Sequence, residues 1–501
     1  MFTLDSFLLF IALFLGIYYC FRERDRRHYK HPPGPWGWPI LGYLPHLGSK
    51  PHQKFVKMAN RYGSVFKVKL GCQEVVVLNG YDTIKEALKQ KGSKFAGRPD
   101  WKSTNVFSDN GTKGTIFSNG KVWSGNRRFE VSALRHFGMG KLSIEEPIVE
   151  ELRHFLGAID GEVGHPFDVA TAVECALTNI IAQMTLGERF KYDDEELKRI
   201  LEMTHEDAEL VGPSAAISFL PALWYIPWFR KQSQRLQQNC AELIEFIGKY
   251  IDRHLATFDP ENIRDVIDVG IQRMKQEEEE RNGVTSFDKL SLAYIVSELF
   301  GAGFESTSTA LKWCILYMVK HPEVQARVQA EIDQQVDRNC HPSFAYADDL
   351  PYTQATIMEV LRVANMAPLG LPHATSGDVE LRGYTLPAGT CVFANVWSVH
   401  MDPDLWPCPE KFDPTRFLDE DGKLVQREGF MPYSLGRRRC VGEQLARHEL
   451  FVFFSGLLQR FSLRLPDGAP VPPAEGKPGL SIAPFPFEVI ATSRLQVTTL
   501  S

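Results

Sequence analysis

The 501-residue sequence predicts a mainly α-helical fold, a helix-rich globule with small peripheral β-sheets, and an N-terminal transmembrane helix. Three observations support this fold class. Most segments of the body space their apolar residues as a helix does. Residues 66–78, FKVKLGCQEVVVL, instead alternate in polarity around a glycine and are rich in β-branched residues, which predicts a β-hairpin. Residues 6–21 form an apolar run without a charge.

The N-terminal run favours a membrane anchor over a cleaved signal peptide. Extended back to Phe2, it approaches the roughly 20 residues that span a bilayer. Basic residues follow the run, and no small-x-small cleavage site is evident. Since positive charge stays on the cytosolic side, we expect a single-pass protein with a cytosolic body. The expected organisation is an anchor at 1–21, a basic and proline-rich linker at 22–42 and one domain at 43–501.

Composition narrows the class of protein. The net charge of −6 argues against nucleic acid as a partner. The nine cysteines show no metal-finger spacing, and their odd number fits no complete disulfide framework. A reducing, cytosol-facing environment is the simpler interpretation.

The segment 433–442, YSLGRRRCVG, carries the most chemical information. It places Cys440 between two glycines and beside three arginines, at the start of an apolar helical run over 443–461. The helix dipole and the guanidinium groups both favour a thiolate, the form of cysteine that binds iron. Glycine lets backbone approach a flat ligand. The segment therefore predicts a thiolate ligand to haem iron, with a buried structural cysteine as the alternative.

These ten residues resemble the haem-thiolate signature of the cytochrome P450 family, Phe-x-x-Gly-x-Arg-x-Cys-x-Gly. Tyr433 stands where the family usually has Phe, and Gly436 matches the first glycine. The resemblance covers nearly the whole chain and implies the cytochrome P450 fold. It also implies haem b (iron protoporphyrin IX) as the cofactor, with Cys440 as the metal ligand that favours O–O cleavage. Other motifs look like the drug-metabolising and steroid 17-hydroxylase branches.

Further motifs extend the resemblance around the cofactor. Glu359 and Arg362 match the family's Glu-x-x-Arg pair, which Arg416 would join in a buried network behind the cysteine loop. Indole and guanidinium groups donate hydrogen bonds, and a haem propionate accepts them. The resemblance implies propionate binding by Trp123, Arg127, Arg98, His373 and Arg438.

A long apolar run over 289–321 contains the motif GAGFEST at 301–307. Charges at Glu298, Glu305 and Lys312 divide it into pieces too short to span a membrane, so a buried core helix is expected. The motif resembles the family's Ala/Gly-Gly-x-Asp/Glu-Thr-Thr sequence, in which the acid and the first hydroxyl relay protons to oxygen. This implies catalytic roles for Glu305 and Ser306, although Ser306 lacks the methyl group of the usual Thr.

The resemblance also maps substrate-binding positions, at Ala302, Ala367, Leu371 and Ile482. The aromatic segment 219–229, FLPALWYIPWF, would lie near a membrane-side entrance, with a buried loop as the alternative. Arginines near the cysteine motif would form a basic docking face for an acidic reductase, namely Arg127, Arg128, Arg135, Arg437, Arg439 and Arg447.

The expected function is haem-dependent monooxygenation in the endoplasmic reticulum membrane. The substrate would be a lipophilic small molecule, such as a steroid, a fatty acid or a xenobiotic. Electrons would come from NADPH through NADPH–cytochrome P450 reductase, with cytochrome b5 as an accessory partner. Two alternatives are a haem-thiolate isomerase or dehydratase, and a non-catalytic haem- or sterol-binding membrane protein. The Glu305–Ser306 pair favours the monooxygenase over both.

Overall fold

The computed structural model describes residues 30–138, 144–280, 287–338 and 340–494. The expected anchor at 1–21 lies outside these residues. Among the helices that are described, none is both long enough and apolar enough to cross a membrane. The chain divides into two compact units, which are described separately. The described part of the first comprises 30–99, 369–398 and 435–438, and the second comprises the remaining described residues.

The first unit is built on a four-stranded sheet of order β1-β2-β7-β4. The predicted hairpin is confirmed: β1 (Val65–Leu70) and β2 (Gln73–Leu78) pair antiparallel, Val65 opposite Leu78. β2 then pairs in parallel with β7 (Cys391–Ala394), and β7 pairs antiparallel with β4 (His373–Ala374). The remaining elements are α2 (Leu44–Leu47), α3 (Pro51–Tyr62), α4 (Tyr81–Lys85), η1 (Glu86–Gln90), the hairpin β5 (Val379–Leu381) and β6 (Tyr384–Leu386), and η6 (Gly436–Arg438).

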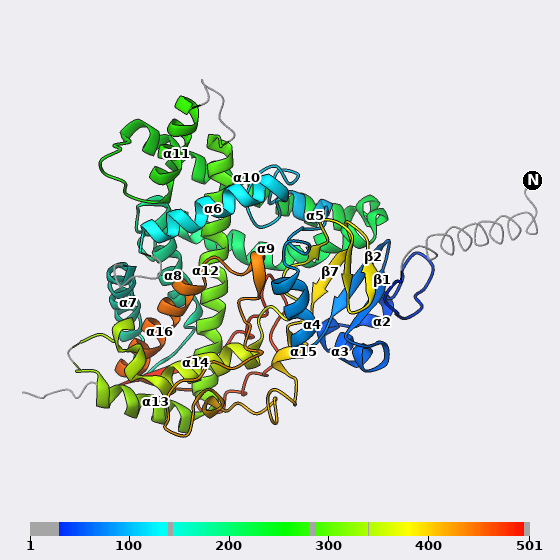
Figure 1. Cartoon of the computed structure of the whole chain (residues 1–501). Coiled ribbons are helices and arrows are strands. Elements are labelled where there is room, and N and C mark those ends of the chain that lie inside the picture. The colour runs from blue at the N-terminus through cyan, green and yellow to red at the C-terminus, as the bar shows by residue number, and fades with distance from the viewer. Residues whose placement is uncertain (1–29, 139–143, 281–286, 339, 495–501) are drawn as a thin grey trace, which may run out of the picture. The chain divides into compact units, whose positions relative to one another are not determined.

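The second unit is helical and is organised around α12 (Lys289–Lys320), which the sequence predicts as a core helix. Figure 1 shows α12 beside α8 (Ala170–Leu186) and α16 (Glu443–Arg460), and all three are rich in buried apolar residues. Burial of these faces supplies the main driving force for packing. Leu152, Phe155 and Phe453 belong to the same core.

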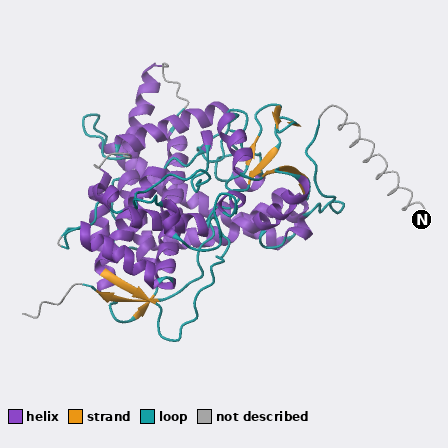
Figure 2. Cartoon of the chain, turned by 60° about the horizontal axis from the view of Figure 1, so that its bottom comes forward, coloured by secondary structure: helices purple, strands orange, loops and turns teal. Residues whose placement is uncertain are grey.

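The other helices of this unit surround that core, and Figure 2 shows how far helices outnumber strands in the described chain. They are α5 (Lys102–Asn105), α6 (Gly120–His136), α7 (Glu145–Asp160), α9 (Glu195–Phe219), η3 (Pro221–Tyr225), α10 (Pro227–Thr257), α11 (Val266–Glu280), α13 (Pro322–Gln335), η4 (Phe344–Asp349), α14 (Pro351–Ala364) and η5 (Pro414–Phe417). α15 (Trp397–His400) lies at the boundary between the two units in the sequence.

A three-stranded antiparallel sheet of order β3-β9-β8 completes the second unit. β3 (Pro166–Phe167) pairs with β9 (Val489–Ser493), and β9 pairs with β8 (Phe461–Arg464). Phe461, expected at the end of the last helix, instead begins β8 directly after α16. The helix-rich fold with small sheets is thus as the sequence predicts.

Candidate haem-thiolate site

Cys440 lies in the loop before α16, where Gly442 is the N-cap residue. Its backbone N–H donates to the carbonyl of Tyr433 (3.1 Å), which closes the loop 433–440. The Cys440 side chain is free and exposed, although protein atoms crowd around it. It is therefore accessible to a ligand while fixed by its backbone.

The helix start and the arginines lower the pKa of Cys440, as the sequence predicts, but the pKa of the free thiol is raised overall. Desolvation is the largest effect and raises the pKa. The Gly442 N–H and the charges of Arg127 and Arg439 oppose this effect without cancelling it, and Glu443 adds to the rise. Because metal coordination itself deprotonates a thiol, the same Gly442 N–H and arginines would then stabilise the coordinated thiolate.

Two helices support the Cys440 loop within the second unit. Arg127 of α6 donates from Nη2 to the Arg439 carbonyl, one residue before Cys440. Trp123, one turn earlier on α6, is buried. Arg447 of α16 stacks its guanidinium 5.5 Å from the centre of the Tyr433 ring. The Tyr433 hydroxyl, expected to need a partner, is buried without one among the described residues.

A buried ionic network anchors the chain ahead of this loop, as predicted. Arg362 forms two bonds with Glu359 (2.7 and 2.8 Å), and both side chains are fully buried. Arg416 of η5 approaches the same carboxylate at 3.3 Å. Arg362 also donates to the carbonyls of His400 and Pro409. The network ties α14 to the segment 400–416.

Within the first unit, a second cluster brings together three of the predicted propionate-binding residues. Arg98 donates to the Pro372 carbonyl (2.7 Å), and Arg438 donates to the Ala96 carbonyl (2.8 Å). His373 Nδ1 lies 2.8 Å from the Phe95 carbonyl, so Nδ1 carries the hydrogen. Burial lowers the pKa of Arg98 to about 10. Burial and the charges of Arg98 and Arg438 lower that of His373 to about 3.

The sequence predicts that glycine lets the backbone approach a flat ligand closely. At Gly436 the close approach is instead to the protein backbone at Leu88. Gly436 has a left-handed φ of +77°, and a Cβ there would lie 1.6 Å from the Leu88 carbonyl oxygen. Only glycine fits this position, which packs η6 on η1 within the first unit.

The centre of α12 departs from the buried character of the rest of the helix. Ala302 and Ser306, four residues apart on one helical face, are exposed, whereas Phe304 and Thr307 to Ala310 are buried. The Ser306 hydroxyl donates to the Ala302 carbonyl (2.9 Å). α12 thus presents one small, polar-edged face to a ligand.

Glu305 bonds to neighbours other than Ser306. Its Oε1 accepts from the Ser481 hydroxyl (2.8 Å). Desolvation raises its pKa, while hydrogen bonds from Ser481 and Thr309 and the charge of Lys312 oppose the rise. A carboxyl group with a raised pKa can hold a proton near neutral pH, which suits an acid–base role.

The predicted substrate positions fall in both units. In the second, Ala367 is exposed, and the N–H of partly buried Ile482 donates to the carbonyl of Met366, next to Ala367. Ile482 also follows Ser481, the partner of Glu305. Leu371 is 47% exposed in the first unit, where its carbonyl lies 3.3 Å from Arg98 Nη1.

One buried acid was missed by the sequence reasoning. Glu449 of α16 is 1% exposed and interacts with the Thr307 hydroxyl, beside Ser306. Desolvation raises its pKa well above the usual value, and its Oε1 has no hydrogen-bond partner among the described residues. The sequence feature that could have revealed Glu449 is its position as a lone acid in the apolar run HELFVFF.

The chemistry of these donors fits a haem group. Cys440 is an accessible thiol at a helix start, and Ala302 and Ser306 form a small, exposed face of α12. The two guanidinium groups of Arg98 and Arg438, beside the neutral imidazole of His373, suit carboxylates. Together with the helix-rich fold, these features define a haem-thiolate class of protein.

Comparison with known proteins supports the haem-thiolate class. The family model described as Cytochrome P450 matches residues 32–491. The chain is 37% identical to Cytochrome P450 18a1 of Drosophila melanogaster over 93% of its length and 87% of the relative's. It is also 37% identical to human Cytochrome P450 2U1 (94% and 91% of the two chains) and to human Cytochrome P450 2J2 (94% and 93%).

The chain therefore belongs to the cytochrome P450 family and is a monooxygenase, an oxidoreductase with a haem-iron cofactor. This assignment favours the monooxygenase over an isomerase, a dehydratase or a non-catalytic binding protein.

Proposed function

We propose that this chain is an endoplasmic-reticulum monooxygenase that hydroxylates a lipophilic small molecule, such as a steroid, a fatty acid or a xenobiotic. It would use O2 and electrons from NADPH. The observation that carries the proposal is the accessible Cys440 thiol at the start of α16, a helix that packs on α12. α12 exposes Ala302 and Ser306 in the middle of a largely buried helix.

The cofactor would be haem b, and the Cys440 sulfur would hold its iron. Bound haem supplies the iron at which oxygen is activated. The Gly442 N–H and the nearby arginines would stabilise the sulfur anion. The propionates would be bound by Trp123, Arg127, Arg98, His373 and Arg438. The loop residues Tyr433 and Gly436 would complete the cofactor-binding set. Because His373 Nδ1 donates to Phe95, Nε2 must gain a proton before it can donate to a propionate.

Proton delivery would depend on Glu305 and Ser306. Glu305 can hold a proton, since burial raises its pKa. The Ser306 hydroxyl lies on the exposed face of α12 and can exchange its bond to the Ala302 carbonyl for one to water or substrate. The two side chains share no bond, so a water molecule would have to connect them.

Small and apolar residues would contact the substrate, namely Ala302, Ala367, Leu371 and Ile482.

An exposed aromatic surface supports the proposal that the substrate enters from the membrane. Tyr225, Ile226 and Trp228 are 84%, 46% and 54% exposed at η3 and the start of α10. This contradicts the buried-loop alternative. Aromatic residues favour the bilayer interface, and residues 1–21 would supply the single-pass anchor.

The electron donor would be NADPH–cytochrome P450 reductase, with cytochrome b5 as an accessory. In the second unit, Arg128 and Arg135 are exposed on α6, whereas Arg439 and Arg447 both pair with Glu443. Exposed arginines suit an acidic flavoprotein. Reductase-supported turnover should therefore fall as salt rises, and a rate independent of ionic strength would contradict this docking.

The deciding experiment is the visible absorption spectrum of the haem-loaded protein. The reduced, carbon-monoxide-bound protein should show the red-shifted Soret band of thiolate ligation, and Cys440→His should lose it. Cys408→Ala is the matched control, because Cys408 is also a free, exposed cysteine of the second unit. The assignment of Cys440 would be wrong if Cys440→Ala kept the band.

A further inference from the structure

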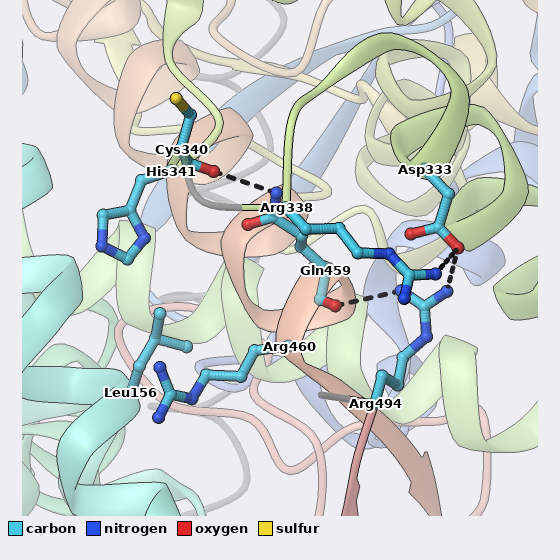
Figure 3. A pocket seen from close by; sticks show the side chains of 8 residues that line it. All are labelled: Leu156, Asp333, Arg338, Cys340, His341, Gln459, Arg460 and Arg494. Carbon is cyan, nitrogen blue, oxygen red and sulfur yellow. Dashed lines mark hydrogen bonds and ion pairs between the residues drawn. The ribbon is translucent and has the colours of Figure 1, made fainter. Parts of the chain in front are cut away.

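A polar cavity lies in the second unit, in a region that shares no residue with the haem-thiolate site. Its volume is about 220 Å³. Figure 3 shows the residues that line it. They are Leu156, Asp333, Arg338, Cys340, His341, Gln459, Arg460 and Arg494.

Guanidinium groups from several segments gather at this cavity. Arg338 follows α13, Arg460 ends α16, and Arg494 follows β9. Arg153, on α7, lies close enough for its charge to lower the pKa of His341. Convergence of four cations from four segments is costly unless negative charge compensates it.

The protein supplies only part of that compensation. Arg338 and Arg494 share one carboxylate, that of Asp333, at 3.5 and 2.6 Å. Arg460 pairs with Asp160 (2.5 Å). Arg153 forms no ion pair among the described residues. The three lining guanidinium groups thus meet two carboxylates, which leaves an excess of one positive charge in the lining, and Arg153 adds a further positive charge nearby.

The neutral lining groups add hydrogen-bonding capacity. Burial, then the charges of Arg153 and Arg460, lower the pKa of His341, so its imidazole is uncharged at neutral pH and donates through one nitrogen. Gln459 donates its amide to the Cys340 carbonyl (3.0 Å) and so holds the segment that carries His341. Arg494 donates to the carbonyls of Leu458 and Gln459. The lining is therefore held by bonds between its own segments.

We propose that this cavity binds a phosphate group, either free or at the end of a small phosphorylated molecule. A phosphate anion suits the positive charge of the lining and of nearby Arg153, and guanidinium forks match its oxygens in pairs. The volume is below the roughly 300 Å³ at which drug-sized pockets begin, which favours a small anion. Leu156 offers one apolar contact for a substituent.

The test is calorimetric titration of the full-length holoenzyme with inorganic phosphate and with pyrophosphate, at constant ionic strength. The variant is Arg338→Gln, because Arg338 is 57% exposed and its one ion pair is long. The matched control is Arg464→Gln, which removes an arginine that is 51% exposed and pairs with Asp467 outside the cavity. An unchanged carbon-monoxide spectrum shows that each variant is folded.

We expect saturable binding of one anion by the wild type and by Arg464→Gln, and about tenfold weaker binding by Arg338→Gln, since a charge-assisted bond is lost. Absence of saturable binding to the wild type overturns the proposal. Equal weakening of both variants also overturns it, because the attraction would then be non-specific.

A second arm identifies the source of the phosphate. Phosphatidylcholine vesicles with and without phosphatidic acid are offered to the wild type and to Arg338→Gln. Vesicle binding that requires phosphatidic acid, needs Arg338 and is displaced by pyrophosphate assigns a lipid headgroup. Vesicle binding indifferent to Arg338, with the soluble anions still bound there, assigns a soluble phosphate.

Discussion

Ser306 and Ser308 of α12 differ in environment but not in local bonding. Each hydroxyl donates to the carbonyl four residues earlier, at 2.9 and 2.6 Å, yet Ser306 is exposed and Ser308 is 1% exposed. Only Ser306 can therefore reach a ligand. Comparing variants of the two serines therefore distinguishes a role of the hydroxyl in proton delivery from a role in helix stability.

We expect Ser306→Ala to keep the carbon-monoxide spectrum and the substrate affinity, while product formed per NADPH falls and hydrogen peroxide rises. Acid–base groups typically contribute about 10² to 10⁴ in rate, and water can replace part of this. Ser306→Thr should keep or improve coupling, because its methyl group restricts the rotamers. Product, peroxide and NADPH are measured together. Equal coupling in Ser306→Ala and the control Ser308→Ala would contradict the role.

Glu449 allows a prediction about pH and stability. Its pKa is raised by burial, so the folded state keeps a proton that the unfolded state loses above about pH 4.5. Stability from this group is complete below that pH and declines as pH rises toward the folded pKa. Glu449→Gln should therefore melt higher than the wild type at pH 7, with the difference vanishing in acid. Melting curves at several pH values check this, and a less stable Glu449→Gln at pH 7 would refute it.

At the scale of elements, the joint between α10 and α11 contains a buried ion pair between His254 and Asp265. His254 Nε2 lies 2.6 Å from Asp265 and Nδ1 lies 2.8 Å from the Tyr250 carbonyl. Both partners are acceptors, so both ring nitrogens carry hydrogens and the imidazole is charged. Desolvation lowers the pKa of His254. The hydrogen bond to Asp265 and the negative charge of Asp265 outweigh this effect, so the pKa is raised.

The contribution of His254 should be complete below about pH 6.5 and should disappear as pH rises through its raised pKa. His254→Gln should cost about 3 kcal/mol at pH 6, because it leaves Asp265 buried without its cation. His321→Gln is the control, since His321 pairs with an exposed Glu323 and should cost less than about 1 kcal/mol. Equal losses in the two variants, measured by denaturant unfolding, would argue against a special role for this joint.

Sequence reasoning predicted elements better than their electrostatics. The hairpin at 66–78, the core helix and the Glu359–Arg362 pair follow from local periodicity and spacing, which the sequence displays directly. The raised pKa of Cys440 could not be predicted, because desolvation depends on atoms from distant segments. Glu449 was overlooked for the same reason: its partner Thr307 belongs to another helix.

At the scale of the whole molecule, exposed aromatic residues occur in both units. Trp36 and Trp38 are 76% and 59% exposed in the first unit, and Tyr225 and Trp228 are exposed in the second. Patches of this kind are typical of surfaces that meet membranes. The residues 1–21 are thus not the only expected contact with a bilayer.

Deletion of residues 2–21 should release the protein from membranes only in part. Adding Trp228→Glu to the deleted form should weaken vesicle association further, by roughly tenfold, because a charge replaces an interfacial aromatic. Val471→Glu is the control, since Val471 is 61% exposed but lies outside the aromatic patches. Co-sedimentation with vesicles measures the change. An equal effect of the two substitutions would mean that added charge alone is responsible.

The pairing of β3 with β9 has a consequence for biosynthesis. Phe167 pairs with Val489, and Pro166 with Ile490, so this sheet joins an early segment of the second unit to nearly its last residues. Loop closure over such a separation is slow. While the ribosome is still translating, β3 lacks its partner strand, and the face of α7 that packs on α16 stays uncovered. Chaperone demand during synthesis, and sensitivity to a premature stop codon ahead of β9, both follow from this one short ladder.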